Sequence, residues 1–287
     1  MAKITASKLC DIAASGWAYL PLIEKALPAK LCTPLLILSL PRSGSSWIGS
    51  VLGASRSAAY MREPMTTAHR RAGHKGTVFE ITDAPAYIAT RRAAALAFGN
   101  VPRFSHSVLR YPRQWSPFEY AKRRTVIKEV NPLALDFLRS RYEFDILFIV
   151  RHPLAIASSF WRVGWWPNRN SKVAADRINT VWNAAFKALE DASSEVVRYE
   201  DICVAPQKMF GQLSKRYEIE FDLDAAKQLE SSITQGDRED RYSTNRLPST
   251  MADAWKEQFT QAEADAFYER YTGHSPVVYR NYAEWIV

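Results

Sequence analysis

Cysteine is scarce in this sequence, and long hydrophobic runs are absent. The three cysteines, Cys10, Cys32 and Cys203, lie far apart and form no C-x-x-C pair, so we expect neither a disulfide framework nor a zinc site. No segment approaches the roughly 20 apolar residues that cross a bilayer. Acidic residues flank the apolar stretch at 12–23 and a proline lies within it, which argues against a signal peptide. We therefore expect a cytoplasmic protein without a transmembrane segment, and leave contact with a membrane surface open.

Low-complexity tracts, internal repeats and linkers are also missing. With 287 residues, 47% of them hydrophobic and 24% charged, the chain has the composition of a folded domain with one large core. Its 38 basic residues against 30 acidic ones give a formal charge of +8, which favours anionic partners. No recognisable nucleic-acid-binding module is present, so we expect no nucleic acid partner.

Two segments have the pattern strand, loop, helix. The apolar run at 35–40 leads into a turn at 41–44 and then into apolar residues at helical spacing. The second run, at 146–150, passes through Arg151-His152-Pro153 into a helix that contains 155–161. Such units indicate a parallel sheet with helical crossovers.

The remaining periodic segments keep this α/β order. They are two strands at 125–128 and 196–199, an amphipathic helix with apolar residues from 178 to 189, and a helix after the capping box of Thr260 and Glu263 that runs to about 271. The segments 65–117 and 235–249 lack a period, and we expect irregular loops there that carry substrate contacts. The sequence predicts an α/β fold, one domain with a central parallel sheet flanked by helices.

The loop after the first strand has the chemistry of an anion site. A strand that leads through 41–46 into a helix presents free N–H groups at the positive end of the helix dipole. A Walker A loop would place glycine at Ser39 and lysine at Ser45, and this chain instead supplies charge from Arg42. A kinase is therefore disfavoured, whereas a ligand with phosphate is not; an ordinary turn is the alternative.

Residues 41–47, with the sequence P-R-S-G-S-S-W, resemble the 5′-phosphosulfate loop of the sulfotransferases that use 3′-phosphoadenosine 5′-phosphosulfate (PAPS). The resemblance implies a P-loop NTPase-like sulfotransferase fold over 34–287, preceded by an N-terminal helical extension at 1–33. It also implies that Trp47 stacks on adenine, although Trp47 could equally be a core residue. The loop residues that it assigns to donor binding are Arg42, Ser43, Gly44, Ser45, Ser46 and Trp47.

A second motif follows about a hundred residues later. The segment 148–153, with Ser159 eight residues after Arg151, resembles the 3′-phosphate site of this family. Tyr199, in a Y-E-D-I segment, matches a tyrosine that lies near the adenine in relatives. Residues 255–260 resemble the W-K-x-x-F-T run of cytosolic members, but the R-K-G triplet upstream is missing, and Arg246 is the candidate substitute.

Sulfuryl transfer needs positive charge at the bridging oxygen and a base for the acceptor proton. Arg42 is the first candidate for the charge. Lys128, which resembles a lysine near the sulfonate in relatives, is the second, with a solvated strand end as the alternative. Cytosolic relatives place a histidine where this chain has Val130, so the base must come from elsewhere.

Glu63 is the predicted base, because carbohydrate and tyrosylprotein relatives place a glutamate shortly after the first helix. Burial in a cleft is expected to raise the pKa of this carboxyl toward the working range of a general base. The alternative is an ion pair with Arg62 or another cation. His69, His74 and His106 are rival bases, for which we expect surface positions.

The resemblance implies transfer of a sulfuryl group from PAPS to a hydroxyl or amine of a carbohydrate, lipid or small molecule, with no metal ion. Four aromatic residues at 160–166 could bind a ring or pack in the core, and the basic stretch at 91–124 could steer an anionic acceptor or be a solvated face. A nucleotide kinase and a non-catalytic nucleotide- or polyanion-binding module are the alternatives. The sequence predicts neither the acceptor nor the oligomeric state.

Overall fold

The computed structural model describes residues 32–116, 122–189, 195–221, 252–272 and 278–287. Almost all of the helical extension predicted at 1–33 lies outside these residues, as do Arg246 and the segment 235–249. Among the described residues, no helix is both long and apolar enough to cross a membrane.

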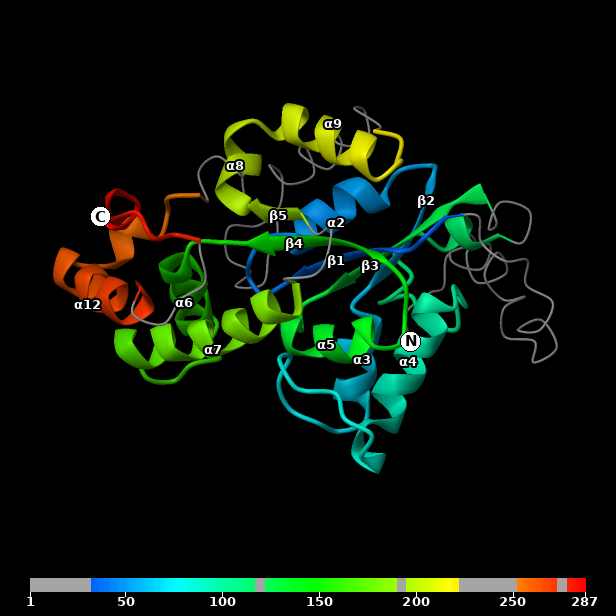
Figure 1. Ribbon diagram of the computed structural model, residues 1–287, viewed down its shortest axis with the longest axis horizontal. Coiled ribbons are helices and arrows are strands. Elements are labelled where there is room, and N and C mark those ends of the chain that lie inside the picture. The colour runs from blue at the N-terminus through cyan, green and yellow to red at the C-terminus, as the bar shows by residue number, and fades with distance from the viewer. Residues whose placement is uncertain (1–31, 117–121, 190–194, 222–251, 273–277) are drawn as a thin grey trace, which may run out of the picture.

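A five-stranded sheet forms the centre of the molecule, and all its neighbouring strands are parallel (Figure 1). Its strand order is β2-β3-β1-β4-β5. The strands are β1 (Leu35–Ser39), β2 (Ala58–Arg62), β3 (Arg124–Glu129), β4 (Asp145–Val150) and β5 (Glu195–Arg198). This confirms the predicted α/β fold and the four predicted strands, while β2 was not predicted.

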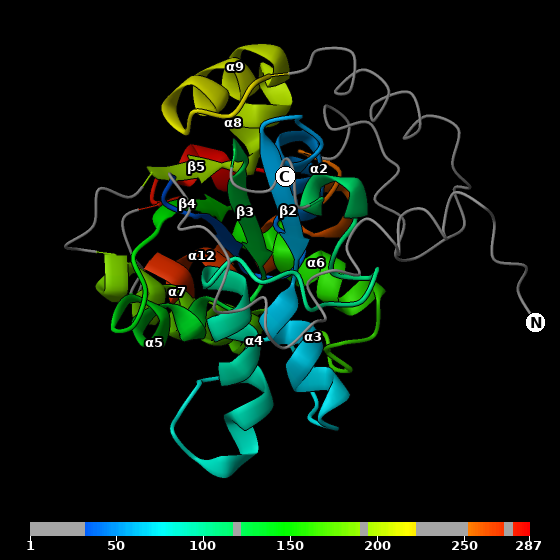
Figure 2. The same cartoon turned by 90° about the vertical axis from the view of Figure 1, so that its right-hand side faces the viewer.

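Helices cover both faces of this sheet (Figures 1 and 2). One face carries α2 (Ser45–Gly53), α8 (Tyr199–Val204) and α9 (Pro206–Arg216). The other face carries α3 (Pro64–Arg71), α4 (Ile88–Phe98), α5 (Leu135–Arg139), α6 (Pro153–Arg162) and α7 (Ser171–Leu189), and α12 (Gln261–Thr272) packs against α7. The 3₁₀ turns are η2 (Pro85–Tyr87), η3 (Pro112–Trp115), η5 (Pro132–Ala134), η6 (Lys256–Gln258) and η7 (Tyr282–Trp285).

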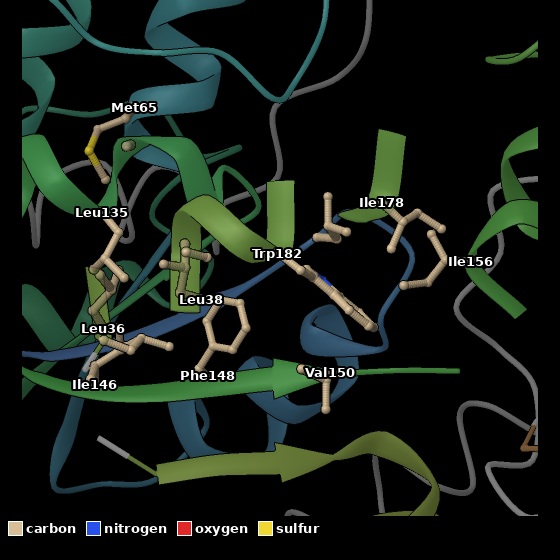
Figure 3. Close-up of a cluster of buried hydrophobic side chains, with 14 of the residues drawn as sticks. Leu36, Leu38, Met65, Leu135, Ile146, Phe148, Val150, Ile156, Ile178 and Trp182 are labelled. Atoms are coloured by element: carbon tan, nitrogen blue, oxygen red, sulfur yellow. The ribbon is translucent and has the colours of Figure 1, made fainter. Parts of the chain in front are cut away.

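Alternation along the strands sorts the core into two clusters. In β1, Leu36 and Leu38 point to the layer that contains α7, and Leu35 and Ile37 point to the layer that contains α2. Figure 3 shows Trp182 of α7 among the side chains of the first layer, where it is fully buried. Because strands covered on both faces must be apolar on both, residues 35–38 are all hydrophobic and Ser39 is the one polar residue of the run at 35–40.

The expectation of an irregular segment at 65–117 was wrong. This segment contains most of α3, all of α4 and the turns η2 and η3. The buried positions of α4 are mainly alanines, among them Ala93, Ala94 and Ala97. Alanine is a strong helix former but gives little apolar periodicity, so the helix does not stand out in the sequence.

The capping box before α12 is present as predicted. The backbone N–H of Thr260 donates to the Glu263 carboxylate at 2.9 Å, and the N–H of Glu263 donates to the Thr260 hydroxyl at 3.3 Å. These reciprocal bonds satisfy two donors that a helix start otherwise leaves free.

Candidate active site at the carboxyl ends of the strands

A cavity of about 1090 Å³ opens at the carboxyl ends of β1 to β4, the position where open α/β sheets bind ligands. Its walls come from the loops after β1 and β4, the turn after β2, the end of β3, and helices α6 and α7. Nine of the predicted site residues line it, namely Arg42, Gly44, Ser45, Ser46, Trp47, Glu63, Lys128, Arg151 and Ser159. Ser43 and Tyr199 are buried and are not among the lining residues of the described part.

The loop between β1 and α2 is shaped to expose its backbone N–H groups. Arg42 and Gly44 have φ values of 70° and 82°, both in the left-handed region. The N–H groups of Gly44, Ser45 and Ser46 have no acceptor among the described residues, and the buried Ser43 hydroxyl has no hydrogen-bond partner there either. Such orphan donors at a helix start suit an anion.

The two sequence motifs meet across this loop. The Arg42 guanidinium donates through Nε to the hydroxyl of Ser159 at 2.8 Å, and Arg151 donates through Nη1 to the carbonyl of Arg42 at 2.9 Å. The structure thus brings Arg42, Arg151 and Ser159 together, although more than a hundred residues separate the motifs.

Tyr199 lies directly behind the loop. Its ring contacts the Arg151 guanidinium, 4.8 Å from the ring centre, and a Cβ on Gly44 would come within 2.2 Å of it. Trp47 packs edge-on against Tyr199 and Phe210, with centroid distances of 6.3 and 5.2 Å. Trp47 is therefore largely a core residue with one edge on the cavity, and stacking on adenine stays a prediction.

Glu63 and Lys128 form an ion pair at the carboxyl ends of β2 and β3. The Lys128 ammonium donates to Glu63 Oε1 at 2.5 Å and to the Ser46 hydroxyl at 3.1 Å. Lys128 is fully buried, so the alternative of a solvated strand end is wrong. The Arg62 guanidinium lies 3.8 Å from the same carboxylate, as the ion-pair alternative anticipated. Lys128 thus connects the predicted base to the phosphate loop.

The electrostatics of this pair differ from the expectation. Burial alone would raise the pKa of the Glu63 carboxyl, but the charge and hydrogen bond of Lys128, together with Arg62 and Arg70, outweigh it and lower the pKa below its ordinary value. Burial lowers the pKa of Lys128, and Glu63 offsets part of that effect. The raised pKa predicted for Glu63 is therefore wrong, and the carboxyl is ionised at neutral pH.

Glu129 is a buried carboxyl next to the pair that the sequence reasoning missed. It accepts the N–H of Met65 at 2.6 Å and the hydroxyl of Thr66 at 2.7 Å, and so holds the first turn of α3. Burial raises the pKa of Glu129 to about 7, although these hydrogen bonds favour the charged form. An acidic residue directly after Lys128 in an apolar strand was the signal that could have found it.

A second group of residues supports the loop after β4. Glu200 accepts the N–H of His152 at 2.9 Å and the hydroxyl of Tyr279 at 2.6 Å. The His152 ring stacks on Trp255, with centroids 4.1 Å apart and planes at 7°, and contacts Trp285 edge-on. The W-K-x-x-F-T segment therefore backs the second motif through Trp255, outside the cavity.

The three rival histidines lie elsewhere. His69 is buried, contrary to the expected surface position, and stacks on Phe79 and His74 with centroid distances of 3.5 and 4.7 Å. His106 is exposed. None of the three is among the cavity-lining residues of the described part, and Glu63 is the one carboxylate among those lining residues.

Comparison with known proteins agrees with this geometry. The sequence profile of the sulfotransferase family matches residues 34–223, about two thirds of the chain. The chain belongs to the sulfotransferase family. No protein with a curated description matches the sequence significantly. The predicted family and enzyme class are confirmed, and the kinase alternative, which the loop chemistry already disfavoured, is set aside.

Solved sulfotransferases share the fold of this sulfotransferase at low identity. The sulfotransferase domain of the Synechococcus PCC 7002 olefin synthase is 19% identical over 82% of this chain and 91% of its own, with a TM-score of 0.50. The mouse sulfotransferase SULT7A1, solved in complex with PAP, is 13% identical over 95% of this chain and 94% of its own, also with a TM-score of 0.50.

Only some of the residues predicted to bind or steer the acceptor line the cavity of this sulfotransferase. Phe160, Trp165 and Trp166 line the cavity, whereas Trp161 packs against Phe259. The basic stretch at 91–124 contributes no lining residue among the described ones, and Arg124 is buried against Asp145. The lining of the cavity therefore gives no support to the hypothesis that the basic stretch at 91–124 steers an anionic acceptor.

Proposed function

We propose that this sulfotransferase moves the sulfuryl group of PAPS to a hydroxyl group of an acceptor, with Glu63 as the general base. An amine is the alternative acceptor group, and the acceptor molecule is a carbohydrate, a lipid or another small molecule. The observation that carries the proposal is the convergence on one cavity of the phosphate loop, the Arg151 motif and the Glu63–Lys128 pair. A cytoplasmic location stays a prediction.

The residues present fit the donor. The free N–H groups of 44–46, the Ser43 hydroxyl and Arg42 would hold the 5′-phosphosulfate, since they combine orphan donors with a cation. Arg151 and Ser159 would hold the 3′-phosphate, and Trp47 and Tyr199 would border the adenine. The solved complex of SULT7A1 with PAP, which has the same fold, supports this choice of nucleotide. Arg246 lies outside the described residues and stays a candidate.

The side chains can manage the charge and the proton of the transfer. The acceptor oxygen forms a bond to sulfur while the bond from sulfur to the phosphate oxygen breaks, and the hydroxyl proton passes to the Glu63 carboxylate. Arg42 and Lys128 stabilise the negative charge that develops on the departing phosphate oxygen. The lowered pKa of Glu63 keeps this base ionised before the proton arrives. Lys128, in contact with both Glu63 and Ser46, is placed to turn toward the donor.

The substitution Glu63→Gln separates chemistry from binding. We expect the variant to bind PAP, the desulfated donor, as the wild type does in calorimetry, while its turnover in a labelled-sulfate assay falls about 10²- to 10⁴-fold, the range of general base catalysis. Glu80→Gln, at an exposed position outside the cavity lining, is the matched control and should keep full turnover. Unchanged turnover in Glu63→Gln would rule out this base.

A further inference from the structure

Part of the cavity lining has no role in the proposed donor site. This part, which we name the acceptor wall, consists of Val78, Leu133, Phe160, Trp165, Trp166 and Ile178. Phe160 contacts Trp165 and Trp166 with ring centroids 5.3 and 4.7 Å apart. Trp165 keeps 41% of its surface exposed. An aromatic surface that remains open in this way suits the flat face of a ring.

The acceptor wall is fixed from the side of the sheet. The Asn131 side chain accepts the N–H of Phe79 at 2.9 Å and donates to the carbonyl of Phe79 at 2.8 Å. Phe79 also stacks on the buried His69. These contacts tie the segment that carries Val78 to Asn131, just beyond the end of β3, so this side of the cavity exists before a ligand arrives.

The charge around the cavity exceeds what the donor site uses. Seven cations and one carboxylate line it among the described residues. The proposed donor site employs Arg42, Lys128 and Arg151. Arg70 and Arg177 have no ion pair with any residue that the structure describes. Arg177 stacks on Trp166 of the acceptor wall at 5.4 Å, and Arg70 acts on the charge of Glu63.

We propose that the acceptor is a hydroxylated ring compound, a sugar or a phenol, that carries an acid group. This inference rests on the proposed function, because the reacting hydroxyl must meet Glu63. The ring lies against the acceptor wall, and the acid group pairs with Arg177, whose guanidinium can bind a carboxylate or phosphate through two parallel hydrogen bonds. Arg70 adds positive potential at the same cavity.

Matched pairs of probes test this assignment. Tyrosol and 4-hydroxyphenylacetate differ in an acid group on a phenol, and methyl glucoside and methyl glucuronide differ in the same way on a sugar. Ligand-observed NMR titrations give the Kd of each probe for the full-length protein, with and without saturating PAP. The proteins to compare are the wild type, Arg177→Gln, Arg70→Ala and the control Arg92→Ala, whose arginine is exposed on α4 outside the cavity lining.

We expect the acid member of at least one pair to bind about tenfold or more tightly than its neutral partner, the effect of one charge-assisted hydrogen bond. Arg177→Gln should abolish that preference, Arg70→Ala should reduce it, and Arg92→Ala should keep it. The pair that shows the preference identifies the ring as a phenol or a sugar. Equal binding within both pairs, no binding by either acid probe, or a preference that survives Arg177→Gln would overturn the proposal.

These titrations and the labelled-sulfate assay together distinguish a failure of this proposal from a failure of the proposed function. If PAP does not bind but the acid preference still depends on Arg177, the assigned donor is wrong and the acid site stands. If PAP binds and labelled sulfate is transferred while the acid preference is absent, the acceptor class is wrong and the enzyme assignment stands.

Discussion

At the scale of single residues, the site is built from backbone conformations that most residues avoid. Arg42 and Glu63, the first candidates for charge stabilisation and for the base, both have positive φ, at 70° and 52°. Left-handed backbone at a non-glycine residue costs about 1–2 kcal/mol and persists only where its surroundings impose it. For Glu63 one such constraint is its N–H, which donates to the Lys128 carbonyl at 2.6 Å. Backbone strain is therefore present where the chemistry is proposed, as it also is at Asn100, Glu218 and Tyr279 elsewhere in the described chain.

Gly44 offers a direct test of the loop geometry. In Gly44→Ala, the alanine would keep a positive φ and its Cβ would clash with the Tyr199 ring. In Gly73→Ala, the alanine would have a similar φ of 88°, but no atom lies within 4 Å of its Cβ. We expect Gly73→Ala to cost about 1–2 kcal/mol of unfolding free energy and Gly44→Ala to cost at least about 2 kcal/mol more, since the ring must move. Urea unfolding of both variants measures the difference. Equal losses of unfolding free energy in the two variants would show that the Tyr199 ring moves aside at no cost.

Glu129 makes a prediction about pH. A carboxyl whose pKa is higher in the folded than in the unfolded protein stabilises the fold at low pH, and that stability is lost as the pH rises through the folded pKa. Between the ordinary value of 4.5 and about 7, the wild type should therefore lose up to about 3 kcal/mol relative to Glu129→Gln. Urea unfolding across this pH range gives the two profiles. Parallel profiles would mean that Glu129 titrates normally.

The same residues show what a single sequence can reveal. Arg42, Arg151 and Ser159 belong to short motifs whose spacing is local, so their roles could be proposed from the sequence. The contact of Lys128 with Glu63, 65 residues apart, depends on β2 pairing with β3, and β2 was not predicted. The lowered pKa of Glu63 follows from that contact and was therefore missed.

At the scale of elements, prediction succeeded where the apolar pattern was strong. β1 and β4 are buried on both faces and are apolar except for Ser39 and Asp145 at their ends, and the predicted bounds of both were correct to within one residue. β2 begins with two alanines, which strands disfavour, and α4 buries alanines instead of large apolar side chains. The residues that pack against β2 and α4 are far away in the sequence, so no local sequence pattern reveals these two elements.

The turn η6 has a role that depends on packing alone. Trp255, just before this turn, stacks on the His152 ring, which Trp285 also contacts, while Glu200 accepts the backbone N–H of His152. We expect Trp255→Ala to lower the unfolding free energy by about 3–5 kcal/mol and to weaken PAP binding, because the loop that carries Arg151 loses its support.

Trp255→Phe is the control for this substitution, since it keeps a ring on His152 and should retain most of both properties. Denaturant unfolding and calorimetry at a temperature where each variant is folded measure the two effects. Wild-type PAP affinity in folded Trp255→Ala would show that the segment does not support the donor site.

At the scale of the whole molecule, the parallel sheet explains why distant motifs share a site. The carboxyl ends of β1 to β4 all point to one edge, so each strand delivers its following residues to the same cavity. The net charge of +8 agrees with an anionic donor. The surplus cations at the cavity lie on β2, α3, α6 and α7 and not in the basic stretch at 91–124; they are Arg62, Arg70, Arg162 and Arg177.

The central claim is that the loops after β1 and β4 together bind the two ends of PAPS. Calorimetry with PAP tests it most directly, on the wild type, Arg42→Ala, Arg151→Ala and the distant control Arg92→Ala. We predict that each of the two loop variants weakens PAP binding by about 10- to 100-fold, the loss of a charge-assisted hydrogen bond, while the control binds as the wild type does. Undiminished PAP binding in both loop variants, or no binding by the folded wild type, would contradict the account.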